Sequence, residues 1–103
     1  MVIVELSIIP IGKTSNISKV LAPALKELDY LGVEYEITPM CTIFEAANVD
    51  GALNLVKAAH EAVFQGDLKR VVTTVKIDDR RDIEKSMKEK VQSLKRAIKE
   101  PQN

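Results

Sequence analysis

Few side chains in this 103-residue sequence are suited to covalent or metal chemistry. The sequence holds one cysteine, Cys41, and one histidine, His60. One thiol excludes an intramolecular disulfide and an iron–sulfur cluster, and a thiol with one imidazole does not make a structural zinc site. Ser7 has no nucleophile-elbow sequence around it. We therefore expect no catalytic residue, no metal site and no cofactor, with Cys41 an inert small residue and His60 a packed or partly exposed one.

One short segment is similar to a phosphate-binding loop. Gly12-Lys13-Thr14 follows an apolar segment and precedes an amphipathic one, but the full motif needs a glycine where this chain has Ser7. We expect a polar turn here. Backbone N–H groups at the start of the following helix remain able to hold an anion or a ligand oxygen.

Charge and composition limit the partners. Lys plus Arg and Asp plus Glu both number 15, so the formal net charge is zero, which argues against nucleic-acid binding and leaves self-association open. No apolar segment approaches the roughly 18 residues that cross a bilayer. The first residues carry no basic region typical of a signal peptide. We expect a soluble, cytoplasmic protein with no membrane or nucleic-acid partner.

The spacing of apolar residues predicts seven elements. Alternation of apolar and polar residues predicts strands over residues 2–9, 33–38, about 41–47 and 70–78. Apolar residues at steps of three and four predict helices over residues 17–31, from 48 or 50 to about 65, and from 83 to about 98. The expected helix caps are Asn16 or Ser18, Asn48 or Asp50, and Asp82. Pro23 should bend the first helix or mark a later start. The buried stripe of the second helix is expected to include Leu53.

The order β-α-β-β-α-β with an added C-terminal helix is the ferredoxin-like pattern. We therefore expect one α+β domain over residues 1–103, with an antiparallel sheet in the order 4-1-3-2 and two helices on one face. Tyr35 and Phe44, the strand aromatics, should face the core with Ile37, which leaves no stacking surface for RNA. The other sheet face is half apolar, so it should meet a partner or be covered by the extra helix.

Acidic residues gather on that uncovered face. The inferred strand order places Glu5 and Ser7 close to Glu45, because the first and third strands are neighbours. A carboxylate enclosed on a strand needs a partner. Two interpretations stay open: an ion pair between subunits, from Glu45 to Lys76 or an arginine, or a cationic or amidine-like ligand whose donors Glu45 accepts.

Three segments together resemble a known family, the thiamine-binding, formerly uncharacterised (UPF0045/DUF77-type) ferredoxin-like proteins. The segments are Ile8-Ile9-Pro10-Ile11-Gly12, Thr38-Pro39-Met40-Cys41-Thr42-Ile43-Phe44-Glu45 and Val75-Lys76-Ile77-Asp78-Asp79-Arg80-Arg81-Asp82. The family's hairpin commonly reads Pro-Met-Gly-Thr-Thr-Ile-Glu-Gly. Pro39, Met40, Thr42 and Glu45 match it, whereas Cys41, Ile43, Phe44 and Ala46 depart from it and should make the site more apolar and tighter.

The resemblance implies a non-enzymatic binding protein that forms homodimers or homotetramers. Thiamine or its hydroxymethylpyrimidine part is the implied ligand: an aminopyrimidine can pair with a carboxylate and a hydroxyl, and a thiazolium cation is favoured near carboxylates. The expected ligand-binding residues are Ser7, Met40, Thr42, Ile43 and Glu45. The alternative is a structural or regulatory assembly protein that uses the sheet face only for subunit contact.

Overall fold

The computed structural model describes residues 1–12, 16–64 and 68–101. Within these ranges the chain forms four strands and three helices: β1 (Val2–Pro10), α1 (Ile17–Tyr30), β2 (Tyr35–Ile37), β3 (Thr42–Ala46), α2 (Val49–Val63), β4 (Val71–Asp78) and α3 (Met87–Lys99). The strands form one antiparallel sheet in the order β2-β3-β1-β4. The predicted α+β ferredoxin-like fold, with strand order 4-1-3-2 and an extra C-terminal helix, is confirmed.

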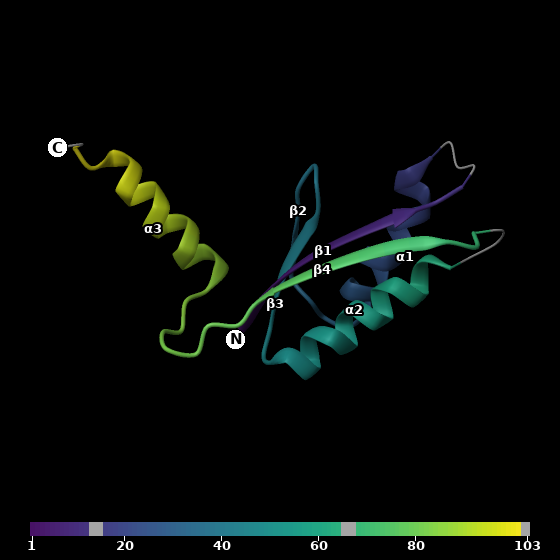
Figure 1. Cartoon of the computed structure of the whole chain (residues 1–103), viewed down its shortest axis with the longest axis horizontal. Helices are drawn as coiled ribbons and strands as arrows, with labels where there is room; N and C mark the ends of the chain where they lie inside the picture. The colour runs from purple at the N-terminus through teal and green to yellow at the C-terminus, as the bar shows by residue number, and fades with distance from the viewer. Residues whose placement is uncertain (13–15, 65–67, 102–103) are drawn as a thin grey trace.

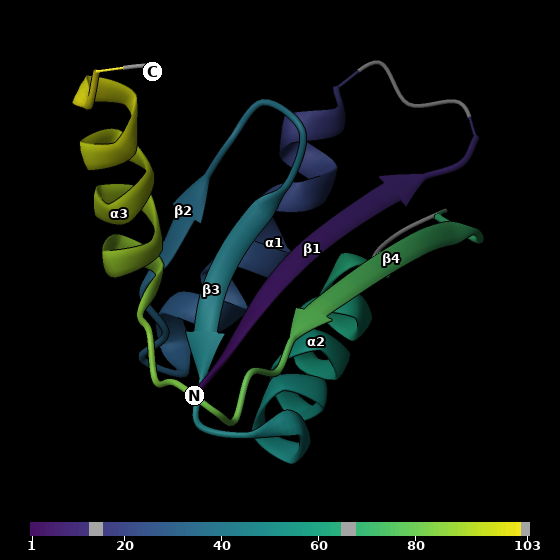
Figure 2. The ribbon, with the colours of Figure 1, turned by 60° about the vertical axis from the view of Figure 1, so that its left-hand side comes forward.

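The core lies between one face of the sheet and α1 and α2 (Figure 2). Alternation along β1 buries Val2, Val4 and Leu6, whereas the residues between them are less buried. Phe44 of β3 and Leu28 of α1 are fully enclosed. The opposite face of the sheet, which we call the open face, carries the alternate residues.

The N-caps of α1 and α2 lie at predicted residues. Asn16 Oδ1 accepts a hydrogen bond from the Lys19 amide, and Asn48 Oδ1 accepts one from the Gly51 amide. Pro23 lies inside α1, which begins at Ile17, so of the two expected effects of this proline the later helix start is wrong. The Gly66-Asp67 pair expected to end the second helix, like Lys13 and Thr14 of the polar turn, lies outside the described residues.

The edge strand β2 is shorter than its alternating pattern predicted. It spans Tyr35–Ile37, and Ile37 is 68% exposed, although the pattern placed it in the core. Ile37 borders a hollow of about 400 Å³ beneath α1, so nothing packs closely on its outer side. Leu53 of α2 is likewise 50% exposed, and the neighbouring Ala52 takes the buried position.

The last helix begins later than predicted and lies apart from the rest of the fold. Its N-cap is Ser86, which forms a capping box with Glu89, whereas Asp82 pairs with Arg80 at 2.7 Å. No residue of α3 is buried. Figure 1 shows α3 standing away from the sheet, on the side opposite α1 and α2. The radius of gyration, 16.1 Å, exceeds the roughly 13 Å expected of a compact chain of about 100 residues.

Candidate functional site

The turn between β2 and β3 is organised by one threonine. Thr38 Oγ1 accepts hydrogen bonds from the amides of Met40 (3.2 Å) and Cys41 (3.0 Å) and donates one to the Cys41 carbonyl (3.0 Å). The Cys41 thiol lies 3.4 Å from the same hydroxyl. A hydroxyl that satisfies a turn's backbone in this way fixes the turn's shape. The hairpin tip therefore presents Met40, 84% exposed, from a defined position.

Three of the five predicted ligand-binding residues border one hollow, which we call the hairpin pocket. Ser7, Met40 and Thr42 line it together with apolar side chains of α1 and the hairpin, in a volume of about 400 Å³. It opens beside the stretch of β1 beyond Leu6, the last β1 residue that pairs with β3. Its size and apolar walls are typical of a small-molecule pocket.

The other two predicted residues, Ile43 and Glu45, lie on the opposite face of the sheet from Thr42. Successive side chains of a strand alternate, and Phe44 between them is buried in the core. Ile43 lies in register between Glu5 of β1 and Glu36 of β2. The five residues therefore do not converge on one point, and Ser7 and Glu45 border different hollows.

Glu45 borders a larger depression, the acidic groove, between the β2–β3 end of the sheet and the start of α3. The groove has a volume of about 760 Å³. Three carboxylates line it, from Glu34, Glu36 and Glu45. Its other walls come from residues 31–33 after α1, the first half of α2 and the start of α3. Lys88 also lines the groove, so three carboxylates face one ammonium group, and this excess of negative charge favours a cation or a group rich in N–H donors.

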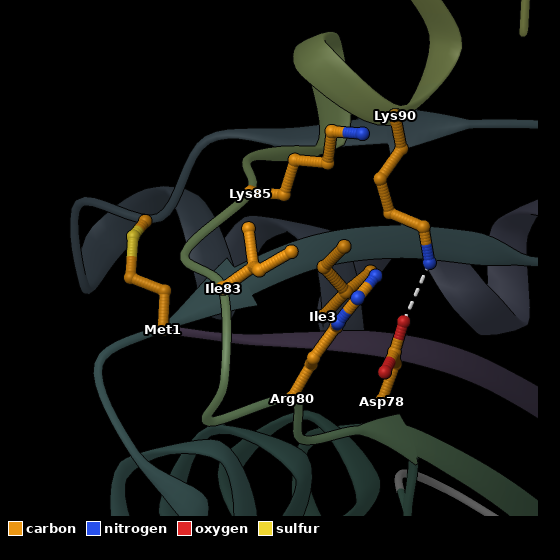
Figure 3. A pocket seen from close by; sticks show the side chains of 7 residues that line it. All are labelled: Met1, Ile3, Asp78, Arg80, Ile83, Lys85 and Lys90. Atoms are coloured by element: carbon orange, nitrogen blue, oxygen red, sulfur yellow. Dashed lines mark hydrogen bonds and ion pairs between the residues drawn. The ribbon is translucent and has the colours of Figure 1, made fainter. Parts of the chain in front are cut away.

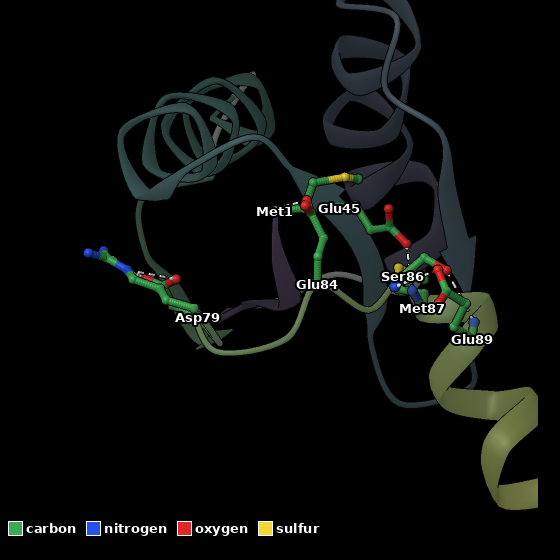
Figure 4. A network of polar contacts seen from close by, with 8 residues as sticks. Met1, Glu45, Asp79, Glu84, Ser86, Met87 and Glu89 are labelled. Carbon is green, nitrogen blue, oxygen red and sulfur yellow. Dashed lines mark hydrogen bonds and ion pairs between the residues drawn. The ribbon is translucent and has the colours of Figure 1, made fainter.

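One oxygen of Glu45 is held by the protein. Its Oε1 accepts a hydrogen bond from the backbone amide of Met87, the first residue of α3, at 2.6 Å (Figure 4). Amides in the first turn of a helix have no partner within the helix, and its positive end favours a carboxylate. Among the described residues Oε2 of Glu45 has no hydrogen-bond partner, so that oxygen is available to a ligand donor.

Sequence reasoning missed the α3 side of this groove. Ser86, Met87 and Lys88 line it, and the Glu45–Met87 contact joins residues 42 positions apart. The Ser-x-x-Glu capping box at Ser86 was a readable signal for the helix start. No local pattern could have indicated that this start lies against β3.

The remaining polar features are structural. The Nδ1 atom of His60 lies 2.6 Å from the Thr73 hydroxyl, and the ring makes an edge contact with Phe64, so His60 is a packed side chain, as expected. Within the described ranges no group of three or more acidic, histidine or cysteine residues is arranged to hold a metal ion. No helix in those ranges is long and apolar enough to cross a membrane.

Two ion pairs, Arg80–Asp82 and Arg81–Asp79, form within the segment before α3. Hydrogen bonding from Arg81 lowers the pKa of Asp79, and hydrogen bonding from Arg80 lowers the pKa of Asp82. Both pairs are exposed, so they contribute little to stability. Because both arginines pair with aspartates of the same segment, neither forms an ion pair with Glu45.

Comparison with known proteins agrees with this architecture. The family model described as thiamine-binding protein matches residues 4–95, from β1 into α3. A UPF0045 protein of Methanothermobacter thermautotrophicus is 46% identical over 99 residues, which cover 95% of this chain and 100% of that protein. The UPF0045 protein YqgV of Bacillus subtilis is 37% identical, with 95% and 98% covered.

Solved structures share the fold. A hypothetical protein of Methanocaldococcus jannaschii superposes with a TM-score of 0.80 at 34% identity, over 91% of this chain and 95% of that one. A candidate thiamine biosynthesis/salvage protein of Thermotoga maritima superposes with a TM-score of 0.76 at 24% identity, over 90% and 97% of the two chains, a likeness that bears on the fold. The match of the family model over most of the chain decides the classification: this chain belongs to the thiamine-binding protein family.

Proposed function

We propose that this protein is a non-enzymatic, cytoplasmic small-molecule binding protein that takes thiamine or a hydroxymethylpyrimidine-like ligand and acts as a homo-oligomer. The observation that carries the proposal is the state of Glu45. One carboxylate oxygen is fixed by the Met87 amide, and the other, beside a groove of about 760 Å³, has no partner among the described residues. A fixed carboxylate with a free oxygen is a pre-organised acceptor for an amino group. Membership of the thiamine-binding family supports the ligand class.

The charges around the groove fit such a ligand. A thiazolium ring carries a permanent positive charge, and Glu34 and Glu36 add to the negative potential that Glu45 provides. An aminopyrimidine supplies the N–H donors that Glu45 can accept. The hairpin pocket, with Ser7, Met40 and Thr42, is the second place where a flat apolar ring could lie.

Isothermal titration calorimetry tests the proposal directly. We expect heat of binding with thiamine, with hydroxymethylpyrimidine, or with both, and we expect Glu45→Gln to weaken it by at least about tenfold, because a charge-assisted hydrogen bond is worth about 1.5–3 kcal/mol. Glu61→Gln, a change of the same kind at an exposed position of α2, is the matched control. Absence of heat with either compound, well above micromolar concentration, would contradict ligand binding.

A second candidate, an assembly protein without a ligand, is favoured by a separate observation. Leu94 and Ile98 of α3 are 64% and 71% exposed, and a small protein rarely leaves such a helix stripe without a partner. If the chain self-associates and gives no heat of binding with thiamine or with hydroxymethylpyrimidine, the assembly function replaces the binding function.

A further inference from the structure

We propose that α3 is an exchanged arm: its apolar stripe docks onto the open sheet face of a second copy of this chain, while the partner's α3 docks onto this one. The inference rests on the self-association in the proposed function and specifies the surfaces that carry it. A mutual exchange of one element is a two-fold symmetric arrangement, which uses the same pair of surfaces twice.

The first support is the surface of α3 itself. Met87, Val91, Leu94 and Ile98 recur at steps of three and four, so they form one stripe along the helix. Val91 is 49% exposed, and exposure rises to 71% at Ile98, the far end. A helix of 13 residues is marginal by itself in water, since most helix stability in proteins comes from packing of the apolar face. Met87 is half-buried at the base of the helix, whereas Val91, Leu94 and Ile98 beyond it are exposed.

The second support is the open face, which has the complementary character. Its apolar residues include Ile9 and Val72, a register pair that is 50% and 41% exposed, and Ile43. Four strands spaced about 4.8 Å apart give a face roughly 19 Å wide. A helix of 13 residues is about 20 Å long. One arm is therefore long enough to cross the whole face.

The third support is charge. On the open face, Glu5 and Glu36 flank Ile43 in register, and neither has a hydrogen-bond or ion-pair partner among the described residues. On α3, Lys88, Lys95 and Lys99 share one flank of the apolar stripe, and they too are unpaired within the described ranges. Lys76 of β4 lies opposite Glu5 in register, so Glu36 is the acidic residue of this row that faces no basic neighbour on the sheet. An apolar row bordered by Glu36 on one surface and by lysines on the other would fix both the register and the direction of docking.

The fourth support is the way the arm is mounted. Two open-face side chains hold its base: Glu45 of β3 accepts from the Met87 amide, and Asp78 of β4 pairs with Lys90 at 2.5 Å. Figure 3 shows the Asp78–Lys90 pair beside a hollow of about 30 Å³, room for about one water molecule. These contacts are polar and lie in the first turn of α3. They therefore set the direction of the helix and leave its apolar stripe free to bind another copy.

Sedimentation equilibrium of the full chain provides the test. We expect Leu94→Glu to raise the dissociation constant of the oligomer by at least about 100-fold, because the leucine is buried twice in a two-fold assembly. Arg96→Gln changes the net charge by the same one unit on the face of the helix opposite the stripe, and it should change the constant by less than about threefold. Circular dichroism of both variants verifies that the fold persists, as expected for positions that bury nothing in one copy.

Charge reversal identifies the surface that receives the arm. Glu36→Lys should weaken assembly by about tenfold, whereas Glu61→Lys on α2 should not, and adding Lys88→Glu with Lys95→Glu to the Glu36→Lys chain should restore it. If Leu94→Glu disrupts assembly but Glu36→Lys has no effect, the arms pair with each other and the exchange onto the sheet is wrong. Self-association that Leu94→Glu leaves intact overturns the inference alone. A chain that stays monomeric at high concentration overturns the proposed self-association as well.

Discussion

The hydrogen bond between Glu45 and Met87 supports both the ligand site and the arm, so its loss should be measurable at a single amide. Glu45 is half-buried, and its Oε1 lies 2.6 Å from the Met87 nitrogen. Replacing Glu45 with alanine removes a charged acceptor worth about 1.5–3 kcal/mol when shielded, and we expect about 1 kcal/mol here because water can reach the site. The Met87 amide should then exchange its hydrogen about five- to tenfold faster.

Nuclear magnetic resonance of amide exchange can resolve this effect. The measurement belongs in the Leu94→Glu background, where self-association cannot protect α3. The Glu89 amide bonds to Ser86 Oγ at 3.1 Å and serves as an internal control, since the capping box does not involve Glu45. Glu45→Gln keeps an acceptor oxygen and should give a smaller increase, about two- to fivefold, from loss of the charge at the helix start. An unchanged Met87 rate in Glu45→Ala would refute the contact and the groove built around it.

Two further predictions concern the core and one tyrosine. Leu28→Ala should lower the free energy of unfolding by about 2–5 kcal/mol in urea denaturation, because Leu28 is fully buried. Leu53→Ala, at a half-exposed position, should lower it by less than about 1 kcal/mol. Equal losses would contradict the assigned core. Burial and the hydrogen bond from the Tyr35 hydroxyl to Asp29 raise the pKa of Tyr35, so this interaction stabilises the fold below pH 10 and is lost as pH rises through the folded-state pKa. In a Tyr30→Phe background, Asp29→Asn should lower the Tyr35 midpoint in an ultraviolet titration, and an unchanged midpoint would count against the contact.

Most of the architecture could be predicted because it depends on local periodicity. Alternation at β1 and β4 and three- and four-residue steps at α1 and α2 specify which faces are apolar, and handedness rules then leave one strand order. The errors arose where the pattern is locally ambiguous. Leu53 and Ala52 are adjacent apolar residues of α2, and only packing against the sheet selects Ala52. Asp82 and Ser86 are both residue types that favour the N-cap position, but Asp82 pairs with Arg80 and Ser86 caps the helix.

The candidate site was harder to predict because it depends on long-range contacts. Sequence reasoning identified Glu45 and the open face, but it gathered Ser7, Thr42 and Glu45 into one site. Strand alternation separates Thr42 from Glu45, and this follows from the sequence once β3 is in register. The involvement of Met87 does not follow, because it depends on where a charged linker of eight residues, 79–86, returns the chain.

The linker of residues 79–86 connects the sheet that carries Glu45 to α3, so it relates the proposed ligand site to the proposed assembly. If α3 docks on a second copy, the groove beside Glu45 has its wall set by the first turn of a helix whose far end is held by the partner. A ligand that draws Glu45 away from the Met87 amide would then weaken the contact that holds the base of α3. By reciprocity, assembly would change the affinity for the ligand. Glu45→Gln weakens the contact of Oε1 with the Met87 amide and the contact of Oε2 with the ligand, so it should reduce ligand affinity and alter the assembly constant together. Leu94→Glu should alter assembly directly and ligand affinity only through that coupling.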